Sequence, residues 1–116
     1  MFTQTAISND SGITTVKFTG RITQGSSLSL AEAQLNQLVV NQGVVKIIFD
    51  LTDVDFIDSA GLGFIVLLRG KLKDKGGQLR LANPNPRVLE LFRLTHTDGF
   101  LEIDADTNES IDKMKA

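Results

Sequence analysis

A serine stands among acidic residues in the middle of the chain, in the sequence DVDFIDSAGLG. This residue, Ser59, follows Asp53, Asp55 and Asp58 and precedes a Gly-x-Gly sequence. A hydroxyl group beside carboxylates could act as a nucleophile, belong to a metal site or be modified by another enzyme. Each kind of site requires different neighbouring residues, so the neighbours decide among them.

Ser59 lacks the neighbours of a catalytic serine. The nucleophile elbow of hydrolases has the sequence Gly-x-Ser-x-Gly, but Ile57 occupies the first glycine position here. The one histidine, His96, lies in the loop-like segment RLTHTDGF, where we expect a solvated or backbone-bonded side chain rather than a general base. There is no cysteine, and hence no thiol nucleophile and no cysteine-based zinc site. We expect no catalytic residue and no enzymatic activity.

The same region gives little support to a metal, nucleotide or phosphoaspartate site. Asp50, Asp53, Asp55 and Asp58 lack the spacing and the final glutamate of an EF-hand, so we expect no metal. The GLG sequence is followed neither by the third glycine of a dinucleotide site nor by the Gly-Lys-Ser/Thr of a P-loop, so we expect no cofactor. A phosphoacceptor role for Asp50 would need an acidic pair to hold magnesium, and KFTGRITQG has none.

Composition indicates one small globular domain over residues 1–116. Hydrophobic residues make up 41% and charged residues 22%, and the net charge is −2. Without a basic excess, nucleic acid is not an expected partner. The sequence MFTQTAISNDSG lacks the features of a signal peptide, and the longest apolar run, 64–68, is far shorter than the ~20 residues of a membrane span. We expect a cytoplasmic protein with no membrane partner.

Hydrophobic periodicity predicts an N-terminal hairpin followed by alternating helices and strands. The β-branched runs FTQTAIS and GITTVKFTG flank the turn NDSG. Four helices are expected, within residues 24–43 (stopped by Gly43), 59–75, 83–95 and 106–116, and three further strands, VVKIIFDL, QLRLA and GFLEI. The expected fold class is α/β, with a small mixed and mostly parallel sheet.

The starts of the helices carry further expectations. Ser29 and Glu32 fit a capping box for the first helix, and an asparagine of NPNPR can cap the third. The segment 53–59, expected to be a loop, and the NPNPR loop each follow a strand. If those strands are neighbours, both loops lie at one edge of the sheet, where parallel α/β folds place their functional crevice.

The sequence from residue 47 to 103 resembles the STAS domain of bacterial anti-sigma factor antagonists. The pattern runs from FTGRI, through a strand ending in DL, to FIDSxGLG, KxxGG and LxLxxxxPxVxxLFxLT, and it covers nearly the whole chain. The resemblance implies a single STAS domain that binds an anti-sigma factor with serine kinase activity. It also implies that the kinase phosphorylates the serine after the aspartate, here Ser59, and that a PP2C-type phosphatase reverses this.

This chain departs from the family pattern at two places, the end of the second strand and the position after the serine. The family usually has Gly-Glu-Leu-Asp at the end of the second strand, an acidic pair that helps to dock the kinase, whereas this chain has Arg21 and Thr23. This difference bears on the identity of the partner and on sigma-factor control. Ala60 replaces the hydroxyl residue that often follows the serine, so Ser59 is the single acceptor in its segment.

A phosphorylated serine explains the missing base, because the kinase brings ATP, magnesium and the base. Ser59 then needs only exposure, which the start of a helix provides, and we expect the N–H groups of Gly61 and Leu62 to be able to receive the phosphate. The alternative interpretation is that Ser59 is only the N-cap of its helix.

A contact face for the partner is expected beside Ser59. The helical period places Leu62, Ile65, Leu68 and Leu72 in one apolar stripe, and Leu67 nearly opposite Ile65 on the side of Gly63. Phe64, on the flank of the stripe, and Leu67 are the expected apolar anchors. Arg87 is expected to be either a solvated charge or a contact to an acidic partner surface or to the phosphate. The expected partner-binding residues are Asp58, Ala60, Gly61, Leu62, Gly63, Phe64, Leu67 and Arg87.

The alternative is a function of another class that also uses a STAS domain. The chain would then be a STAS subunit of a lipid or solute transporter, or a scaffold in a larger sensory assembly. Genomic neighbours would separate the two functions, because a GHKL-type kinase and a PP2C-type phosphatase accompany the first and transporter genes the second.

Overall fold

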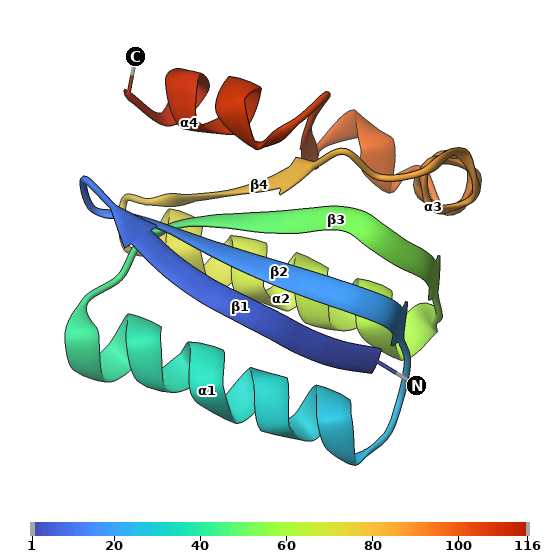
Figure 1. The fold of residues 1–116 in the computed structure, drawn as a ribbon, viewed down its shortest axis with the longest axis horizontal. Helices are drawn as coiled ribbons and strands as arrows, with labels where there is room; N and C mark the ends of the chain where they lie inside the picture. The colour runs from blue at the N-terminus through green and yellow to red at the C-terminus, as the bar shows by residue number, and fades with distance from the viewer. Residues whose placement is uncertain (1, 116) are drawn as a thin grey trace.

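A five-stranded mixed sheet forms the centre of the molecule (Figure 1). The computed structural model describes the backbone of residues 2–115 and, within the first strand, the side chains of residues 7–9. The first two strands are antiparallel and the other pairs are parallel, which confirms the predicted hairpin and the mostly parallel α/β sheet. In spatial order the strands are β1 (Phe2–Asp10), β2 (Ile13–Ile22), β3 (Lys46–Ile57), β4 (Gln78–Ala82) and β5 (Glu102–Asp104).

Helices cover both faces of this sheet (Figure 1). One face carries α1 and α2, and the other carries α3 and α4. None of the helices in the described part of the chain is long and apolar enough to cross a membrane. Their bounds are α1 (Ser26–Gln42), α2 (Ser59–Asp74), α3 (Pro86–Leu94) and α4 (Thr107–Lys115), with a short 3-10 helix η1 (Thr97–Gly99).

The main core lies between the sheet and the pair α1 and α2. Phe49 on β3 stands at its centre, with its ring 4.8 Å from that of Phe18 in an edge-to-face contact and 5.7 Å from that of Phe64 in a stacked one. The predicted apolar stripe of α2 is buried there, as Ile65, Leu68 and Leu72 are. A smaller cluster, on the side of α4, contains Ile13, Ile48, Ala82 and Met114.

β3 runs further than the sequence indicated. The expected strand ended at Leu51, but β3 continues to Ile57 and pairs with β2 along its length. Val54 and Ile57 point into the core, whereas Asp53 and Asp55 are exposed. The polar residues of the sequence TDVD are typical of a turn, but here they are the solvent-facing residues of a strand. The pairing of this strand with β2 has two register irregularities. The last strand is also displaced, since η1 comes first and β5 begins only at Glu102.

The start of α1 differs from the expected capping box. The N-cap is Gly25, with no side-chain hydrogen bond to the helix. The hydroxyl of Ser29 instead donates to the carbonyl oxygen of Gly25, at 3.3 Å. A glycine with φ of 150° brings the chain into the helix, and few other residues adopt this backbone conformation. Gly43 ends the helix in the left-handed conformation, as predicted.

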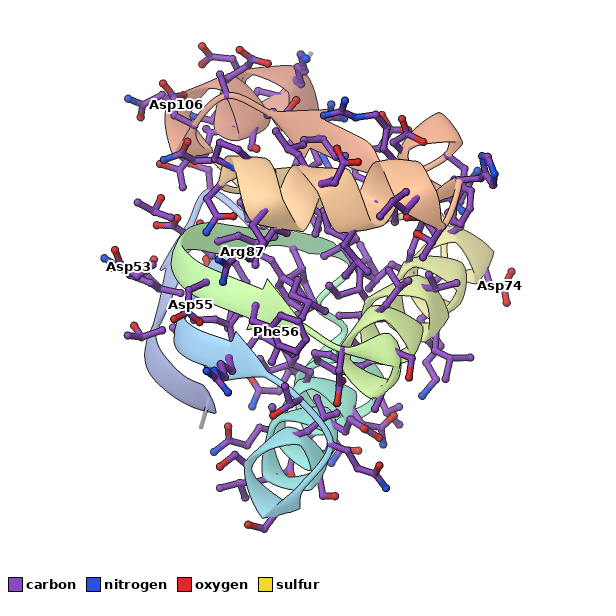
Figure 2. All side chains as sticks on the ribbon, turned by 90° about the vertical axis from the view of Figure 1, so that its right-hand side faces the viewer. Asp53, Asp55, Phe56, Asp74, Arg87 and Asp106 are labelled. Atoms are coloured by element: carbon purple, nitrogen blue, oxygen red, sulfur yellow. The ribbon has the colours of Figure 1, made fainter. Side chains whose placement is uncertain are left out.

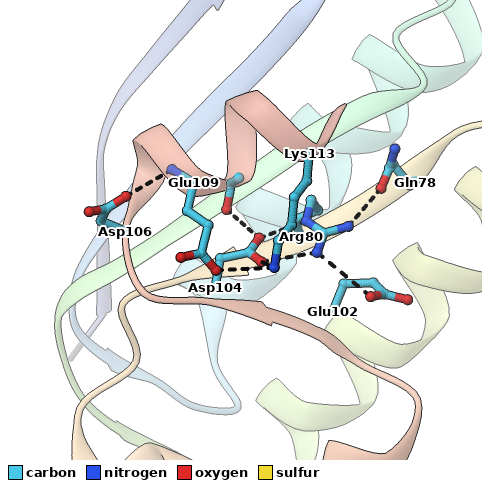
Figure 3. Close-up of polar contacts among 8 residues, drawn as sticks. Gln78, Arg80, Glu102, Asp104, Asp106, Glu109 and Lys113 are labelled. Atoms are coloured by element: carbon cyan, nitrogen blue, oxygen red, sulfur yellow. Dashed lines mark hydrogen bonds and ion pairs between the residues drawn. The ribbon is translucent and has the colours of Figure 1, made fainter. Parts of the chain in front are cut away.

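A buried cluster of charged and polar side chains connects β4, β5 and α4 (Figure 3). Asp104 is 3% exposed and accepts hydrogen bonds from Arg80 Nε at 2.6 Å, Ser110 Oγ at 2.6 Å and Lys113 Nζ at 3.0 Å. Each group in this cluster has a partner of suitable charge or polarity, which a buried carboxylate requires. We call Arg80, Asp104, Ser110 and Lys113 the Asp104 cluster.

Candidate functional site

Ser59 lies where the carboxyl end of β3 meets the start of α2. It is the first residue of the helix and is exposed. The NPNPR loop lies against the same strand, because Asn85 Nδ2 donates to the carbonyl oxygen of Val54 at 2.8 Å and Asn83 Nδ2 to Thr52 Oγ1 at 3.2 Å. β3 and β4 are neighbours, so the structure brings the two segments to one edge, as the sequence predicted.

Asp58, and not Ser59, caps α2. Its Oδ1 accepts from the backbone N–H of Gly61 at 2.8 Å, and its Oδ2 from that of Gln24 at 3.0 Å. Burial tends to raise the pKa of Asp58, but the backbone N–H groups that donate to its carboxylate outweigh this and lower the pKa below its usual value. The residue therefore stays ionised at the start of the helix, where the helix dipole also favours a negative charge.

The capping by Asp58 corrects two expectations. The alternative in which Ser59 only caps the helix is wrong, because that role belongs to its neighbour. The expected phosphate-receiving N–H groups are also occupied, since Gly61 donates to the Asp58 carboxylate and Leu62 to the Asp58 carbonyl oxygen at 2.9 Å. An acidic group already fills the anion-binding position at this helix start.

Asn85 caps α3 in the same way, as the sequence suggested. Its Oδ1 accepts from the backbone N–H of Val88 at 2.8 Å, and Pro86 follows at the first helical position. This cap orients the first turn of α3, which carries Arg87.

The exposed face of α2 has one large apolar side chain. Leu67 is 68% exposed, and a Cβ added to Gly63 or to Gly70 would meet no atom within 4 Å. Leu67 also borders a groove of about 60 Å³ between α1 and α2, together with Leu35, Val39 and Lys71 among others. The expectation of an exposed, glycine-flanked Leu67 is therefore confirmed.

Two of the residues expected on this face are directed inward. Phe64 is 6% exposed and stacks on Phe49 in the core, so the expectation of a second exposed anchor is wrong. Gly61 is buried, and an added Cβ there would collide with the carbonyl oxygen of Ile22 and approach Ile57 Cγ2 to 2.9 Å. Gly61 thus allows α2 to pack closely on β2. Ala60 and Leu62 are half-buried.

Arg87 shares a hollow with residues that the sequence did not place beside it. The hollow has a volume of about 150 Å³ and is lined by Arg21, Asp55, Phe56 and Arg87. Figure 2 shows Asp55, Phe56 and Arg87 together near the end of β3, with Asp74 far away on the side of α2. Arg21 was identified only as a departure from the family pattern, and Phe56 was missed because its segment was expected to be a loop.

The other candidate groups are not gathered into a site. Within the described residues, no three histidine or acidic side chains lie close enough to hold a metal ion. Asp53 pairs with Lys17 at 3.1 Å. His96 is exposed, between α3 and η1.

Known proteins resemble this chain in sequence. The sequence profile of the STAS domain matches residues 4–110. A candidate anti-sigma factor antagonist of Thermotoga maritima is 33% identical over 76 residues, which are 66% of this chain and 67% of that protein. The anti-sigma-B factor antagonist of Bacillus subtilis is 34% identical over 61 residues, 53% of this chain and 56% of that protein.

Solved structures share the arrangement of elements described above. The crystal structure of a candidate anti-sigma factor antagonist from Thermotoga maritima has a TM-score of 0.89 at 23% identity over the structural alignment, which covers 96% of this chain and 94% of that one. The anti-sigma factor antagonist SpoIIAA in its unphosphorylated form has a TM-score of 0.76 at 20% identity, with 100% and 99% covered. These structures show the same fold, and the profile match over residues 4–110 shows the family. The chain belongs to the STAS domain family.

Proposed function

We propose that this protein is a partner-switching module of the anti-sigma factor antagonist kind. In its unphosphorylated form it binds an anti-sigma factor that is also a serine kinase, in the cytoplasm. Phosphorylation of Ser59 by that kinase releases it, and a PP2C-type phosphatase restores the binding form. Anti-sigma factor antagonists of the STAS family are non-enzymatic regulatory proteins.

The observation that carries this proposal is that the Ser59 hydroxyl is exposed and does not cap the helix. Ser59 is the first residue of α2, but Asp58 supplies the cap. In the part of the structure that is described, the Ser59 hydroxyl forms no hydrogen bond, and the sequence offers it no general base. A hydroxyl in this position can enter the active site of a kinase while the helix keeps its first turn. The solved structure of Bacillus SpoIIAA in its phosphorylated form, which has a TM-score of 0.72 and 20% identity, supports the same chemistry by analogy.

A phosphate on Ser59 is expected to lower the affinity for a partner that covers this position. A phosphoserine carries about −1.5 to −2 charges, and the adjacent Asp58 is ionised and already accepts the nearby N–H groups. The free protein solvates the added charge in water. A partner surface placed over it would remove that water without supplying a counter-charge, at a cost of the order of a few kcal/mol in binding. The switch thus acts on affinity and not on the fold.

The test is a calorimetric titration of the purified kinase with the unmodified and the phosphorylated protein. We expect strong binding of the first form and weak binding of the second. Ser59→Ala should bind and remain unmodified, and Ser59→Asp should release partially, because aspartate has a single charge. Ser29→Ala, at an exposed position of α1, is the control and should still be phosphorylated. Equal affinities for both forms, or phosphate on a residue other than Ser59, would refute the proposal.

A further inference from the structure

Two arginines from distant parts of the sequence meet beside one aromatic ring. Arg21 on β2 is opposite Phe56 on β3 in the strand register, and its guanidinium lies over the Phe56 ring at 6.0 Å from the centroid. Arg87 reaches the same hollow from the first turn of α3. The Asn85 side chain ties that turn to β3, so all three residues stand on fixed elements. We call this hollow the Arg21–Arg87 hollow.

The Arg21–Arg87 hollow has an excess of positive charge. Two guanidinium groups line it together with a single carboxylate, that of Asp55. Within the described residues neither Arg21 nor Arg87 forms an ion pair. The neighbouring acids have other partners, since Asp53 pairs with Lys17 at 3.1 Å and Asp58 accepts backbone N–H groups. Arg21 and Arg87 are both exposed, so their guanidinium groups are accessible to a ligand.

The chemistry of these side chains suits a carboxylate. A planar guanidinium binds a carboxylate through two parallel hydrogen bonds. Stacking on an aromatic ring restricts Arg21 before binding, which reduces the entropy lost when a ligand binds. Phe56 is 41% exposed and offers apolar area next to the charges, and arginine and aromatic residues contribute most to protein interfaces. We propose that the Arg21–Arg87 hollow receives an aspartate or glutamate side chain of the protein partner.

This inference rests on the partner binding proposed above and adds the charge of the partner's surface. The hollow and Ser59 lie on different faces of the sheet. Ile22 points into the core on the α2 side, where its carbonyl oxygen contacts Gly61 and accepts from Asp58 N. Because side chains alternate along a strand, Arg21 points to the opposite face, which α3 covers. The hollow is therefore placed for a second contact with the partner rather than for the Ser59 phosphate.

Charge reversal tests the hollow with the kinase as the binding partner. Arg21→Glu and Arg87→Glu should each weaken binding roughly 10- to 100-fold, because a glutamate would face the partner's carboxylate. Lys75→Glu makes the same change of charge on an exposed residue at the far end of α2, and should weaken binding less than about threefold. Equal effects of all three variants would overturn the inference. Failure of the wild-type protein to bind the kinase would instead refute the proposed function.

A second measurement needs no kinase. The isotope-labelled full chain is titrated by NMR with the peptide acetyl-Leu-Glu-Glu-Leu-amide, with its glutamine analogue and with inorganic phosphate, at equal millimolar concentrations. We expect the glutamate peptide alone to shift the Nε–Hε signals of Arg21 and Arg87. In Arg21→Gln, which lacks the first signal, the peptide should no longer shift the Arg87 signal. The inference is overturned if the glutamine peptide acts equally, if phosphate binds more tightly, or if the two signals do not move.

Discussion

Ser59 and Asp58 divide between them two roles that a single residue often combines at the start of a helix. Asp58 accepts the N–H of Gly61 and so stabilises the first turn of α2. Ser59 follows it with an exposed side chain. The separation allows a charged group to be added to the serine while the cap stays in place.

Alanine substitutions of the two residues should therefore differ in their effect on stability. Asp58→Ala removes an acceptor from two backbone N–H groups and should lower the free energy of unfolding by about 1–2 kcal/mol. Ser59→Ala should change it by less than about 0.5 kcal/mol, because no folded contact is lost. Urea denaturation followed by circular dichroism measures both. A larger loss for Ser59→Ala than for Asp58→Ala would show that the serine is the cap.

One face of α2 packs closely on the sheet and the other is open to solvent, and its glycines show this difference. Gly61 packs against the backbone of Ile22, whereas Gly63 faces open space. The two residues are two positions apart, and one is needed for packing while the other costs helix stability. A small residue on an exposed helix face leaves room for another surface to approach, which agrees with the contact expected around Leu67.

The two glycines give a matched pair of alanine variants. Gly61→Ala should destabilise the protein by about 1–3 kcal/mol, because the new methyl group forces α2 away from β2. Gly63→Ala should stabilise it by roughly 0.5–1 kcal/mol, since alanine favours the helix. Both values come from urea denaturation midpoints. Equal and small effects would show that α2 does not pack closely on the Ile22 carbonyl.

The exposed face of α2 can be tested through Leu67. Leu67→Arg should leave the free energy of unfolding within about 0.5 kcal/mol of the wild-type value, because this side chain is largely exposed. It should nevertheless weaken kinase binding by about 2 kcal/mol or more, as expected for an apolar anchor at an interface. Leu94→Arg, at an equally exposed position of α3 where the leucine is 71% exposed, is the control. If Leu67→Arg binds like the wild type, this face is not the interface.

At the scale of the whole molecule, the Asp104 cluster holds the C-terminal helix to the sheet. Burial tends to raise the pKa of Asp104, but the hydrogen bonds from Arg80, Ser110 and Lys113 outweigh it and hold the pKa far below its ordinary value. A carboxyl group with a lowered pKa stabilises the folded state above its unfolded pKa of about 3.9 and loses this contribution as the pH falls toward the folded value. Stability should thus decline in acid.

Removal of the Asp104 charge should reveal this contribution. Asp104→Asn leaves the buried Arg80 with only the half-exposed Glu102, 3.7 Å away, as a counter-charge, and should cost about 3–5 kcal/mol at pH 7. The variant should also lose less stability than the wild type when the pH is lowered below about 4. Lys113→Met removes a half-exposed partner of the same carboxylate and should cost about 1 kcal/mol or less. Urea denaturation between pH 7 and a pH below about 4 measures the free energy of unfolding of each variant. Parallel pH profiles for Asp104→Asn and wild type would contradict the assignment.

Much of the fold could be predicted from local sequence. The hairpin, the alternation of helices and strands, the Gly43 stop and the buried stripe of α2 all follow from period, turn residues and capping chemistry, which depend on residues close in the chain. The exposure of Leu67 follows in the same way, because a helical period determines which residues lie opposite the buried stripe. Ser59 was identified through its motif and the absence of a base, and its phosphorylation stays a prediction.

Only the tertiary structure decided what depends on contacts between distant segments. Local polarity ended β3 at Leu51, but pairing with β2 carries the strand to Ile57. Phe64 lies at the flank of the α2 stripe, and the ring of Phe49 buries it. The Asp58 carboxylate also accepts a hydrogen bond from the backbone of Gln24, in the loop between β2 and α1. The meeting of Arg21, Phe56 and Arg87 requires the β2–β3 register and the docking of α3, and no spacing within one segment contains that information.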